Sequence, residues 1–263
     1  MKKVKLFVNN NEKSLEVAKT IKEKLEKKNF KIVEEDYEIA IAIGGDGSFL
    51  RMIKETAFNE DFIYVGINAG TLGFAQEINL DEIGEFIKSL EQEDYKIEEI
   101  GIAEIEIKTP DSISKQLALN EIVIRDLDLN TVNLKLMVEK ELLENYVGDG
   151  ILISTSFGST AYNLSFGGSI VYNTFHTLQI TPIAPLNNKS YRNLLNSVII
   201  PSNKEISAIP ENRTKDLLIT IDGDNSEYKN VEEVSVKIEG RTIKVFRKKE
   251  YNFISKINNK FLK

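Results

Sequence analysis

The stretch IAIGGDGSFLR, residues 41–51, joins an apolar run to a glycine-rich turn and then to a segment of helical character. The apolar run is continuous and β-branched, which is typical of a parallel strand buried on both faces. Three glycines turn the chain after it: Gly44, Gly45 and Gly47. Ser48 is placed to cap the helix that follows. This strand–turn–helix pattern predicts an open α/β sheet with the turn at its carboxyl edge.

The residues around this stretch alternate predicted strands and helices. Residues 3–9 (KVKLFVN) and 62–68 (FIYVGIN) read as further strands. Two helices are expected from apolar residues at helical spacing, one with Leu15, Ala18, Ile21 and Leu25 on its buried face and one with Ile83, Phe86, Ile87 and Leu90. The sequence therefore predicts a doubly wound, Rossmann-like α/β domain over residues 1–98.

The apolar period changes from 3.6 to 2 near residues 95–101. Short or alternating apolar runs then follow one another with turn residues between them: IAEIEI, LNEIVI, TVNLKLMV and GDGILIS. Such runs are typical of packed antiparallel sheets. We therefore expect an all-β, sandwich-like domain over residues 99–242. Near the end of the chain, Ile254, Ile257 and Phe261 recur at the spacing of a helical face.

The composition limits the classes of function. Among 263 residues, 41 are acidic and 34 basic, a net charge of −7, so a binder of nucleic acid or of a membrane surface is not expected. The absence of cysteine excludes disulfides, thiolate metal sites and a cysteine nucleophile. No apolar run has the length of a signal segment or a membrane span. The sequence thus predicts a soluble, cytoplasmic protein.

Asp46 is the unusual residue of the glycine-rich turn. Backbone N–H groups at a helix N-terminus favour phosphate, and an acid is a poor partner for phosphate there. Asp46 could instead bind Mg²⁺, accept a proton from an attacking hydroxyl, or form a hydrogen bond that closes the turn. The chain has no G-x-x-x-x-G-K-[ST] motif, and GDGSFL lacks the third glycine of a dinucleotide fingerprint.

Three further stretches carry polar groups in apolar surroundings. Asn120 and Glu121 stand side by side at the start of a predicted strand, where a strand edge or turn is the simpler explanation. Residues 147–168 combine hydroxyls and small residues with the aromatic ring of Tyr162, a composition that suits a nucleotide base and ribose. Asp222 lies in TIDGDN, which favours a hairpin turn.

Taken together, these stretches resemble the NAD kinase family. The segments that carry the resemblance occur in the family's order over essentially the whole chain: GGDGSFL, LGF (72–74), NEIVI, GDGILIS, GSTAYNLSFGG, TPIAPLNN and TIDGDN. The first alone would not be specific, because phosphofructokinases and lipid kinases carry similar loops. NEIVI and GSTAY make the match specific.

The resemblance implies a role for each matching position. Asp46 would be the base or orienting group for the adenosine 2'-hydroxyl. The implied NAD-binding residues are Gly45, Gly47, Phe74, Asn120, Glu121, Asp149, Ser156, Thr160, Ala161, Tyr162, Ala184, Leu186 and Asp222. Phosphate or ATP contacts are expected from Gly44, Ser48 and Arg51, and the metal ligands are unknown. The segment 243–263 would pack back on the first domain.

The implied reaction transfers the terminal phosphoryl group of ATP, or of polyphosphate, to the 2'-hydroxyl of the adenosine ribose of NAD, with Mg²⁺ as the divalent metal. Two alternatives stay open: a lipid or sugar kinase that shares only the glycine-rich loop, and a catalytically silent dinucleotide sensor. A homodimer or homotetramer is expected. The chain departs from the family at Ser156 and Phe157, where a proline and a small hydroxyl residue are usual.

Overall fold

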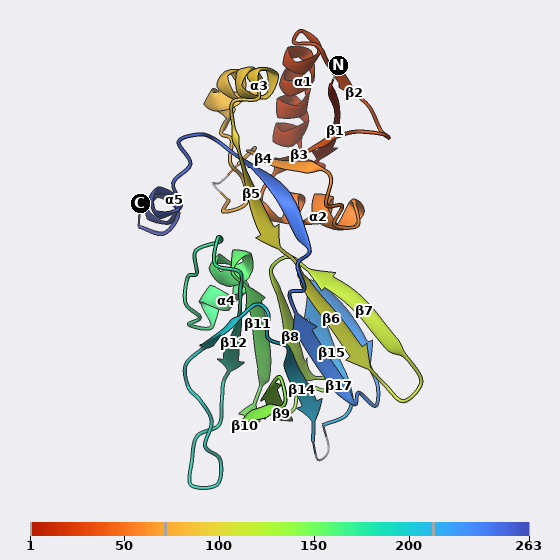
Figure 1. Cartoon of the computed structure of the whole chain (residues 1–263), viewed down its shortest axis with the longest axis vertical. Coiled ribbons are helices and arrows are strands. Elements are labelled where there is room, and N and C mark those ends of the chain that lie inside the picture. Colours follow the sequence, from red (N-terminus) through yellow and green to blue (C-terminus); the bar gives the residue numbers. More distant parts are fainter. Residues whose placement is uncertain (1, 71–72, 212–213, 263) are drawn as a thin grey trace. The chain divides into compact units, whose positions relative to one another are not determined.

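The computed structural model describes residues 2–70, 73–211 and 214–262 (Figure 1). Leu72, the first residue of the LGF motif, lies outside the described residues. The chain divides into two compact units. Unit 1 comprises residues 1–100 together with 242–263, and unit 2 comprises residues 101–241.

Unit 1 is built on one six-stranded sheet. In spatial order its strands are β2 (Phe30–Ile32), β1 (Lys2–Val8), β3 (Ile39–Gly44), β4 (Ile63–Asn68), β18 (Thr242–Arg247) and β5 (Lys96–Gly101). The pairs from β2 to β18 are parallel. All six residues of β3 are buried, as expected for a central strand covered on both faces. The α/β prediction for the first part of the chain is confirmed.

Helices cover both faces of this sheet. They are α1 (Glu12–Glu26), α2 (Asp46–Glu55) and α3 (Ile83–Gln92), the last preceded by the 3₁₀ turn η1 (Leu80–Glu82); α5 (Phe253–Phe261) packs on the ring of Phe74 in the segment after β4. Helices α1 and α3 share one core cluster with Ile39, Ile41 and Ile43 of β3. Successive strand residues point to opposite faces, so the small Ala40 and Ala42 face the side where α2 packs (Figure 1).

The buried face of α1 differs from the one predicted. Its buried residues are Ser14, Val17, Ile21 and Leu25, whereas the side chain of Leu15 is 53% exposed. Ile21 and Leu25 were predicted correctly, and Leu15 was wrong. The helix is capped by the Asn11 side chain, which accepts a hydrogen bond from Ser14 N, and this start places Val17 over the sheet.

The end of the chain returns to unit 1, as expected. Strand β18 pairs with β4, and α5 then packs through the ring of Phe253 on that of Phe74. The predicted apolar face of α5 is wrong at Ile254, which is 60% exposed, whereas Phe261 of that face stacks on Phe74; the buried residues of the helix are Phe253 and Lys256. A charged side chain thus occupies a position inside the fold where the apolar pattern predicted none.

Unit 2 is a sandwich of two antiparallel six-stranded sheets, which confirms the all-β prediction. The first sheet, in spatial order, consists of β10 (Glu141–Gly148), β9 (Val132–Val138), β14 (Ile206–Pro210), β17 (Glu233–Lys237), β6 (Ala103–Lys108) and β7 (Ile113–Ala118). The second consists of β13 (Val198–Pro201), β12 (Thr177–Ile183), β11 (Gly150–Thr155), β8 (Glu121–Asp126), β15 (Leu217–Ile221) and β16 (Asp224–Tyr228). Two short helical segments follow β11, namely η2 (Phe157–Thr160) and α4 (Tyr162–Ser165).

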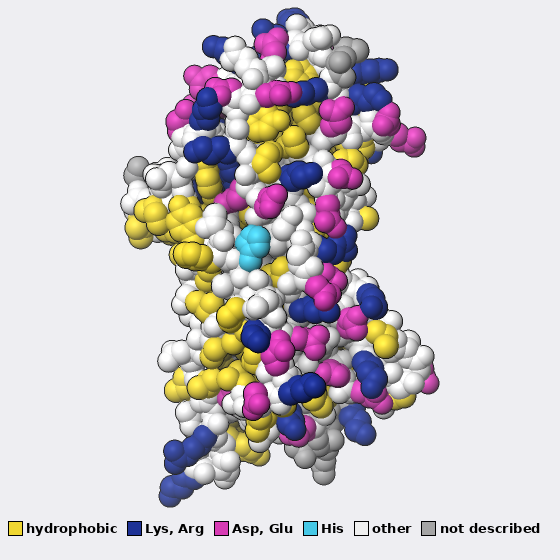
Figure 2. All heavy atoms as spheres, viewed as in Figure 1, with side chains coloured by type: hydrophobic (Ala, Val, Ile, Leu, Met, Phe, Trp, Pro, Cys, Tyr) yellow, Lys and Arg dark blue, Asp and Glu magenta, His cyan; other side chains and the backbone are white. Residues whose placement is uncertain are grey.

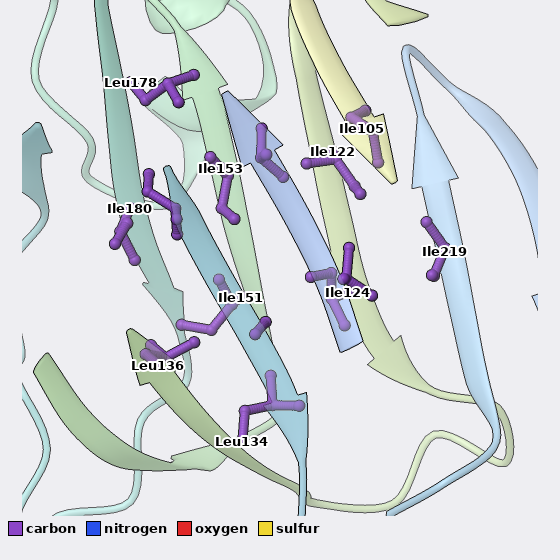
Figure 3. Packing of buried hydrophobic residues seen from close by; sticks show 14 of the residues in the cluster. Ile105, Ile122, Ile124, Leu134, Leu136, Ile151, Ile153, Leu178, Ile180 and Ile219 are labelled. Atoms are coloured by element: carbon purple, nitrogen blue, oxygen red, sulfur yellow. The ribbon is translucent and has the colours of Figure 1, made fainter. Parts of the chain in front are cut away.

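The core of unit 2 lies between its two sheets. Ile122 and Ile124 of one sheet and Leu134 and Leu136 of the other belong to one buried cluster, together with Ile151 of β11 (Figure 3). Leu134 and Leu136 alternate along β9 with Asn133 and Lys135, which gives the sequence its period of 2 there, whereas Val123 of β8 and Leu152 of β11 are buried on the other face of their sheet. Their packing fixes where β8 and β11 end, and the polar residues singled out above lie at those ends.

The surface carries charges of both signs intermixed on the face shown in Figure 2. The single histidine, His176, is exposed. Within the described residues, no helix combines the length and apolar character that crossing a membrane requires.

A buried ion cluster ties β18 into unit 1 and gives a stability prediction. The guanidinium of Arg247, 1% exposed, donates to Glu98 Oε2 at 2.7 Å and lies 3.5 Å from Glu77 Oε2. Removing one partner of a buried ion pair typically costs about 3–5 kcal/mol, so we expect Arg247→Met to lower the free energy of unfolding by that order. Urea denaturation measures it.

The matched control is Lys244→Met in the same strand, whose half-buried side chain should change the free energy of unfolding by less than about 0.5 kcal/mol. Equal stability of Arg247→Met and the control would contradict the structural role of the cluster.

Candidate functional site

The glycine-rich turn places the start of α2 at the carboxyl end of β3. Gly44 has a φ of +156°, and a Cβ on it would collide with the side chain of Ser48. Gly45 is the N-cap residue, in an extended conformation and without a side-chain cap. The prediction that Ser48 caps α2 was therefore wrong. Because the helix already begins at Asp46, the buried Ser48 lies inside its first turn.

The Asp46 carboxylate is held by main-chain donors from a distant segment. Oδ2 accepts a hydrogen bond from Phe74 N at 2.9 Å, and Oδ1 accepts one from Ala75 N at 2.8 Å. The residue itself is exposed. A carboxylate oxygen has two acceptor positions, so each oxygen of Asp46 keeps one for another donor. The acid between the glycines is thus fixed in orientation and still reachable, rather than closing its own turn.

Close approach at Gly73 brings a second polar side chain to Asp46. A Cβ on Gly73 would collide with both Asp46 Oδ1 and Gln76 Oε1, so these two oxygens flank the same point. Gln76 is 1% exposed, and its side-chain amide has no hydrogen-bond partner among the residues that the structure describes. The segment 73–76 therefore depends on glycine to reach Asp46.

Lys256 of α5 lies against the same segment. Its ammonium donates to Gln76 O at 2.7 Å and to Glu77 Oε2 at 3.2 Å, and it lies 5.8 Å from the ring centroid of Phe74. Burial lowers the pKa of Lys256 to about 8, the Arg247 guanidinium lowers it too, and the carboxylates of Glu77 and Asp46 oppose this shift. Asp46 is therefore close enough for its charge to act on Lys256.

The other residues expected at this end of unit 1 have structural partners. Phe74 is 7% exposed and packs on the rings of Phe253 and Phe261. Arg51 donates to Val8 O at 3.0 Å and lies 3.4 Å from the carboxylate of Glu55. Gly45 and Gly47 have open space where a Cβ would be, which leaves room beside the first turn of α2.

In unit 2, Asp222 organises the start of β8. It is the first residue of a two-residue hairpin, with φ values of +48° at Asp222 and +85° at Gly223, and the predicted turn is confirmed. The carboxylate accepts hydrogen bonds from the N–H groups of Leu119, Asn120 and Glu121 at 2.7, 2.7 and 3.1 Å. Asp222 thereby sets the direction in which the side chains of Asn120 and Glu121 leave the chain.

Glu121 and Tyr162 line one cavity of about 330 Å³, together with Arg125, Thr220 and other residues of β8, β15 and β16. Glu121 is 7% exposed and Tyr162 is 41% exposed. The Tyr162 hydroxyl accepts a hydrogen bond from Arg125 at 3.2 Å, and its ring meets the edge of Phe166 at 4.8 Å between centroids. A carboxylate and an accessible aromatic ring thus lie on one polar-rimmed pocket.

The loop after β11 is held by its own hydroxyl and amide groups. The Ser156 hydroxyl bonds the backbone of Phe175 and Thr177, so its oxygen serves the loop itself. Buried Asn163 donates to Ser159 O at 3.2 Å and accepts from the Thr181 hydroxyl at 2.6 Å. These bonds fix the half-buried Thr160 and Ala161 immediately before the ring of Tyr162.

Asp149, Ala184 and Leu186 are brought together at the other end of β11 and β12. Asp149 N donates to Ile183 O at 3.0 Å, and Leu186 N donates to Val147 O at 2.8 Å. All three are exposed, and Ala184 has a φ of +45°. Buried Asn193 exchanges two hydrogen bonds of 3.0 Å with the backbone of Val147 and holds this end in place.

Sequence reasoning missed four residues of these clusters: Gln76, Glu77, Arg125 and Lys256. The signal for Lys256 was present, since it stands three residues after Phe253, but Ile254 and Ile257 gave a competing helical face. Within the ranges that the structure describes, no group of three or more His, Cys, Asp or Glu side chains is arranged to hold a metal ion.

Two protein-family models match this chain. Residues 3–95 match the model of the ATP-NAD kinase N-terminal domain, and residues 119–246 match that of the ATP-NAD kinase C-terminal domain. An NAD kinase of Finegoldia magna is 39% identical over 98% of this chain and 97% of its own length. The chain belongs to the NAD kinase family.

More distant members of the family agree in sequence and in fold. An NAD kinase of Streptococcus gordonii is 33% identical over 92% of this chain and 88% of its own. The crystal structure of yeast NADH kinase complexed with NADH has a TM-score of 0.83 at 21% identity, covering 100% of this chain and 87% of that chain. An Archaeoglobus fulgidus NAD kinase in complex with ATP has a TM-score of 0.75 at 20% identity, covering 98% and 99%. The last two likenesses establish the fold.

The crowding at Gly73 predicts a sensitive position. Gly73→Ala places a methyl group where Asp46 and Gln76 oxygens lie, so the carboxylate has to move, and we expect the turnover of NAD to NADP to fall about 10- to 100-fold. Steady-state kinetics at saturating substrates measures this.

Gly70→Ala is the matched control, because no atom lies within 4 Å of the position that its Cβ would take. Equal turnover of the two variants would remove the steric argument for the orientation of Asp46.

Proposed function

We propose that this member of the NAD kinase family transfers the terminal phosphoryl group of ATP to the 2'-hydroxyl of the adenosine ribose of NAD, giving NADP and ADP. One observation carries the assignment of the chemistry. The Asp46 carboxylate is exposed, is fixed through both oxygens by Phe74 N and Ala75 N, and stands at the start of α2 after a buried strand. A fixed carboxylate at such an edge is suited to orient a substrate hydroxyl.

The transfer forms one bond to phosphorus and breaks another. The ribose oxygen forms a bond to the terminal phosphorus, the bond from that phosphorus to the bridging oxygen breaks, and ADP leaves with the electron pair. Asp46 accepts the proton of the hydroxyl on the lone-pair position that the backbone donors leave open. Positioning the hydroxyl is the main task of the protein, since phosphoryl transfer demands little covalent chemistry of it.

Most of the proposed NAD-binding residues lie in unit 2; the others, in unit 1, are Gly45, Gly47 and Phe74. Tyr162, with Thr160 and Ala161 before it, would hold adenine, and Asn120 with Glu121 would bond ribose hydroxyls. The accessible ring and the carboxylate on one cavity support this pairing. Asp149, Ala184 and Leu186 would face the nicotinamide end, and Asp222 and Ser156 would act through the backbone that they hold.

The phosphates would be met by main-chain donors and by a divalent ion. The first N–H groups of α2, at Asp46 and Gly47, have no intrahelical partner, and the glycines Gly44 and Gly45 let a phosphate approach. Among the described residues, no cluster of acidic side chains is arranged to hold a metal ion by itself. We therefore expect Mg²⁺ to bind together with the triphosphate, as MgATP. The ion would neutralise charge on the phosphates. Polyphosphate is the alternative donor.

The competing functions have less support. A lipid kinase needs an apolar entry surface, whereas the loop around Tyr162 is rich in hydroxyl and amide groups. A silent sensor would have no use for a carboxylate oriented by two backbone donors. A homodimer or homotetramer in the cytoplasm stays a prediction; exposed apolar side chains at Leu186, Tyr191, Leu194, Leu195 and Ile199 support self-association.

Direct turnover tests the proposal. The protein is incubated with NAD and MgATP, and NADP is measured with an NADP-specific dehydrogenase. We expect product with NAD and none in excess chelator. Phosphorylation of a lipid or sugar without NADP formation would overturn the function, and full activity in chelator would overturn the metal requirement. Replacing ATP by polyphosphate defines the donor.

Asp46→Asn tests the proton acceptor. Asparagine keeps one oxygen for the backbone donors but is not basic, so we expect turnover at saturating MgATP to fall roughly 10²- to 10⁴-fold. One of the two backbone hydrogen bonds is also lost, worth about 0.5–1.5 kcal/mol of folding free energy. Asp61→Asn, on an exposed turn, is the control. Wild-type turnover of Asp46→Asn would leave Asp46 a purely structural residue.

Tyr162→Ala tests the adenine site. Loss of base stacking is worth on the order of 1–3 kcal/mol, and we therefore expect the affinity for NAD, measured by calorimetry, to fall by about one or two decades. Tyr162→Phe keeps the ring, loses the hydrogen bond from Arg125, and should bind NAD nearly as the wild type does. An alanine variant with unchanged affinity would assign the ring to packing against Phe166.

A further inference from the structure

A chain of contacts within unit 1 leads from α5 to the Asp46 carboxylate. The N–H groups of Phe74 and Ala75 hold the carboxylate, and the next residue, Gln76, donates no side-chain hydrogen bond within the described residues. The segment is tied to β4 through Glu77 N, which donates to Gly66 O at 2.9 Å, and at Gln76 its backbone carbonyl accepts from Lys256 Nζ at 2.7 Å. The same ammonium binds Glu77 Oε2 at 3.2 Å.

We propose that Lys256 is a positioning residue for phosphoryl transfer. Its ammonium clamps residues 76–77, and this clamp orients the two N–H groups that aim Asp46. The inference rests on the proposed function of Asp46 and extends it to a residue more than 200 positions away in the chain. Lys256 itself is 9% exposed and lies 5.8 Å from the ring centroid of Phe74, so we expect it to act through the backbone that it binds and not on the substrate directly.

Burying the Lys256 ammonium costs desolvation free energy, which an apolar side chain of similar size would not. Four groups face the ammonium: Glu77 after β4, Arg247 of β18, Tyr251 before α5, and Asp46 of α2. Arg247 is itself paired with Glu98 of β5. An apolar side chain at residue 256 would avoid the desolvation of an ammonium. The ammonium thus balances the charge of Glu77 and at the same time binds the backbone carbonyl of Gln76, which an apolar side chain could not do.

The clamp is expected to release in mildly alkaline solution. Burial holds the pKa of Lys256 at about 8, below its usual value near 10.5, so the side chain loses its proton as the pH rises through 8. A neutral amine binds the carbonyl and the carboxylate less strongly than an ammonium does. The same shift has the opposite effect on folding: between about pH 8 and 10.5 only the unfolded chain holds this proton, so its titration raises stability with pH. We therefore expect turnover to fall over the same pH range, above about pH 8, in which this titration raises stability.

Three variants separate the clamp from mere packing. Lys256→Met removes the charge and keeps most of the volume, Lys256→Arg keeps a charge that persists above pH 10, and Lys260→Met removes a positive charge from the exposed side of α5 as the control. At pH 7 we expect kcat of Lys256→Met to fall about 10- to 100-fold with KM for NAD within about twofold of wild type. Lys260→Met should match the wild type.

The pH profile of kcat is the deciding measurement. We expect wild-type kcat to decline above about pH 8 and Lys256→Arg to keep its own neutral-pH value to pH 9. An alkaline limb unchanged in Lys256→Arg, or a wild-type kcat in Lys256→Met, would overturn the proposal.

A second readout is independent of NADP formation. If the clamp holds these amides in place, hydrogen exchange at Phe74 N and Ala75 N should be faster in Lys256→Met than in wild type at pH 7. It should be unchanged in Lys260→Met. Equal protection in Lys256→Met and wild type would overturn the clamp even if the enzyme is active. If the exchange differs while wild-type protein makes no NADP, the clamp holds and the proposed function fails.

Discussion

The buried carboxylate of Glu77 is the constraint on which the arrangement of unit 1 depends. It lies 3.5 Å from Arg247 and 3.2 Å from Lys256, and it accepts from Lys248 N at 3.3 Å. An isolated buried charge would cost several kcal/mol, so the carboxylate requires these partners. All of them come from the last residues of the chain. These contacts hold α5 and the end of β18 against the segment after β4, in addition to the backbone pairing of β18 with β4.

Steric freedom is the second requirement at the same place. Gly66 lets the backbone of Ala75 and Gln76 approach β4, where a Cβ would come within 2.9 Å of Ala75 O. Gly73 then lets the same segment reach Asp46. Glycine at these two positions allows main-chain N–H groups, rather than flexible side chains, to hold the carboxylate. A rigid donor pair defines the direction of the acceptor better than a lysine or arginine side chain would.

Backbone hydrogen bonds compensate part of the negative charge on two of the carboxylates proposed for the site. Asp222 accepts three backbone N–H groups in unit 2, and Asp46 accepts two in unit 1. Hydrogen bonds of this kind compensate much of a negative charge. In the proposed NAD site, this compensation reduces the repulsion between the acidic side chains and the phosphates of the dinucleotide. Asp222 acts through the backbone that it holds, whereas Asp46 combines its two backbone donors with the proposed contact to the substrate hydroxyl.

The sequence by itself determined the two fold classes, the position of the turn before α2, the Asp222 hairpin and the family, because periodicity, glycine positions and ordered motifs are local properties of the chain. It failed at the start of α2 and on the faces of α1 and α5, where a cap or a buried charge overrides the apolar pattern. Only the tertiary structure decided that Asp46 is held from residues 74 and 75 and that Lys256 is buried beside them. Those contacts join segments 28 to 180 residues apart, and no local signal encodes which donor will meet which acceptor.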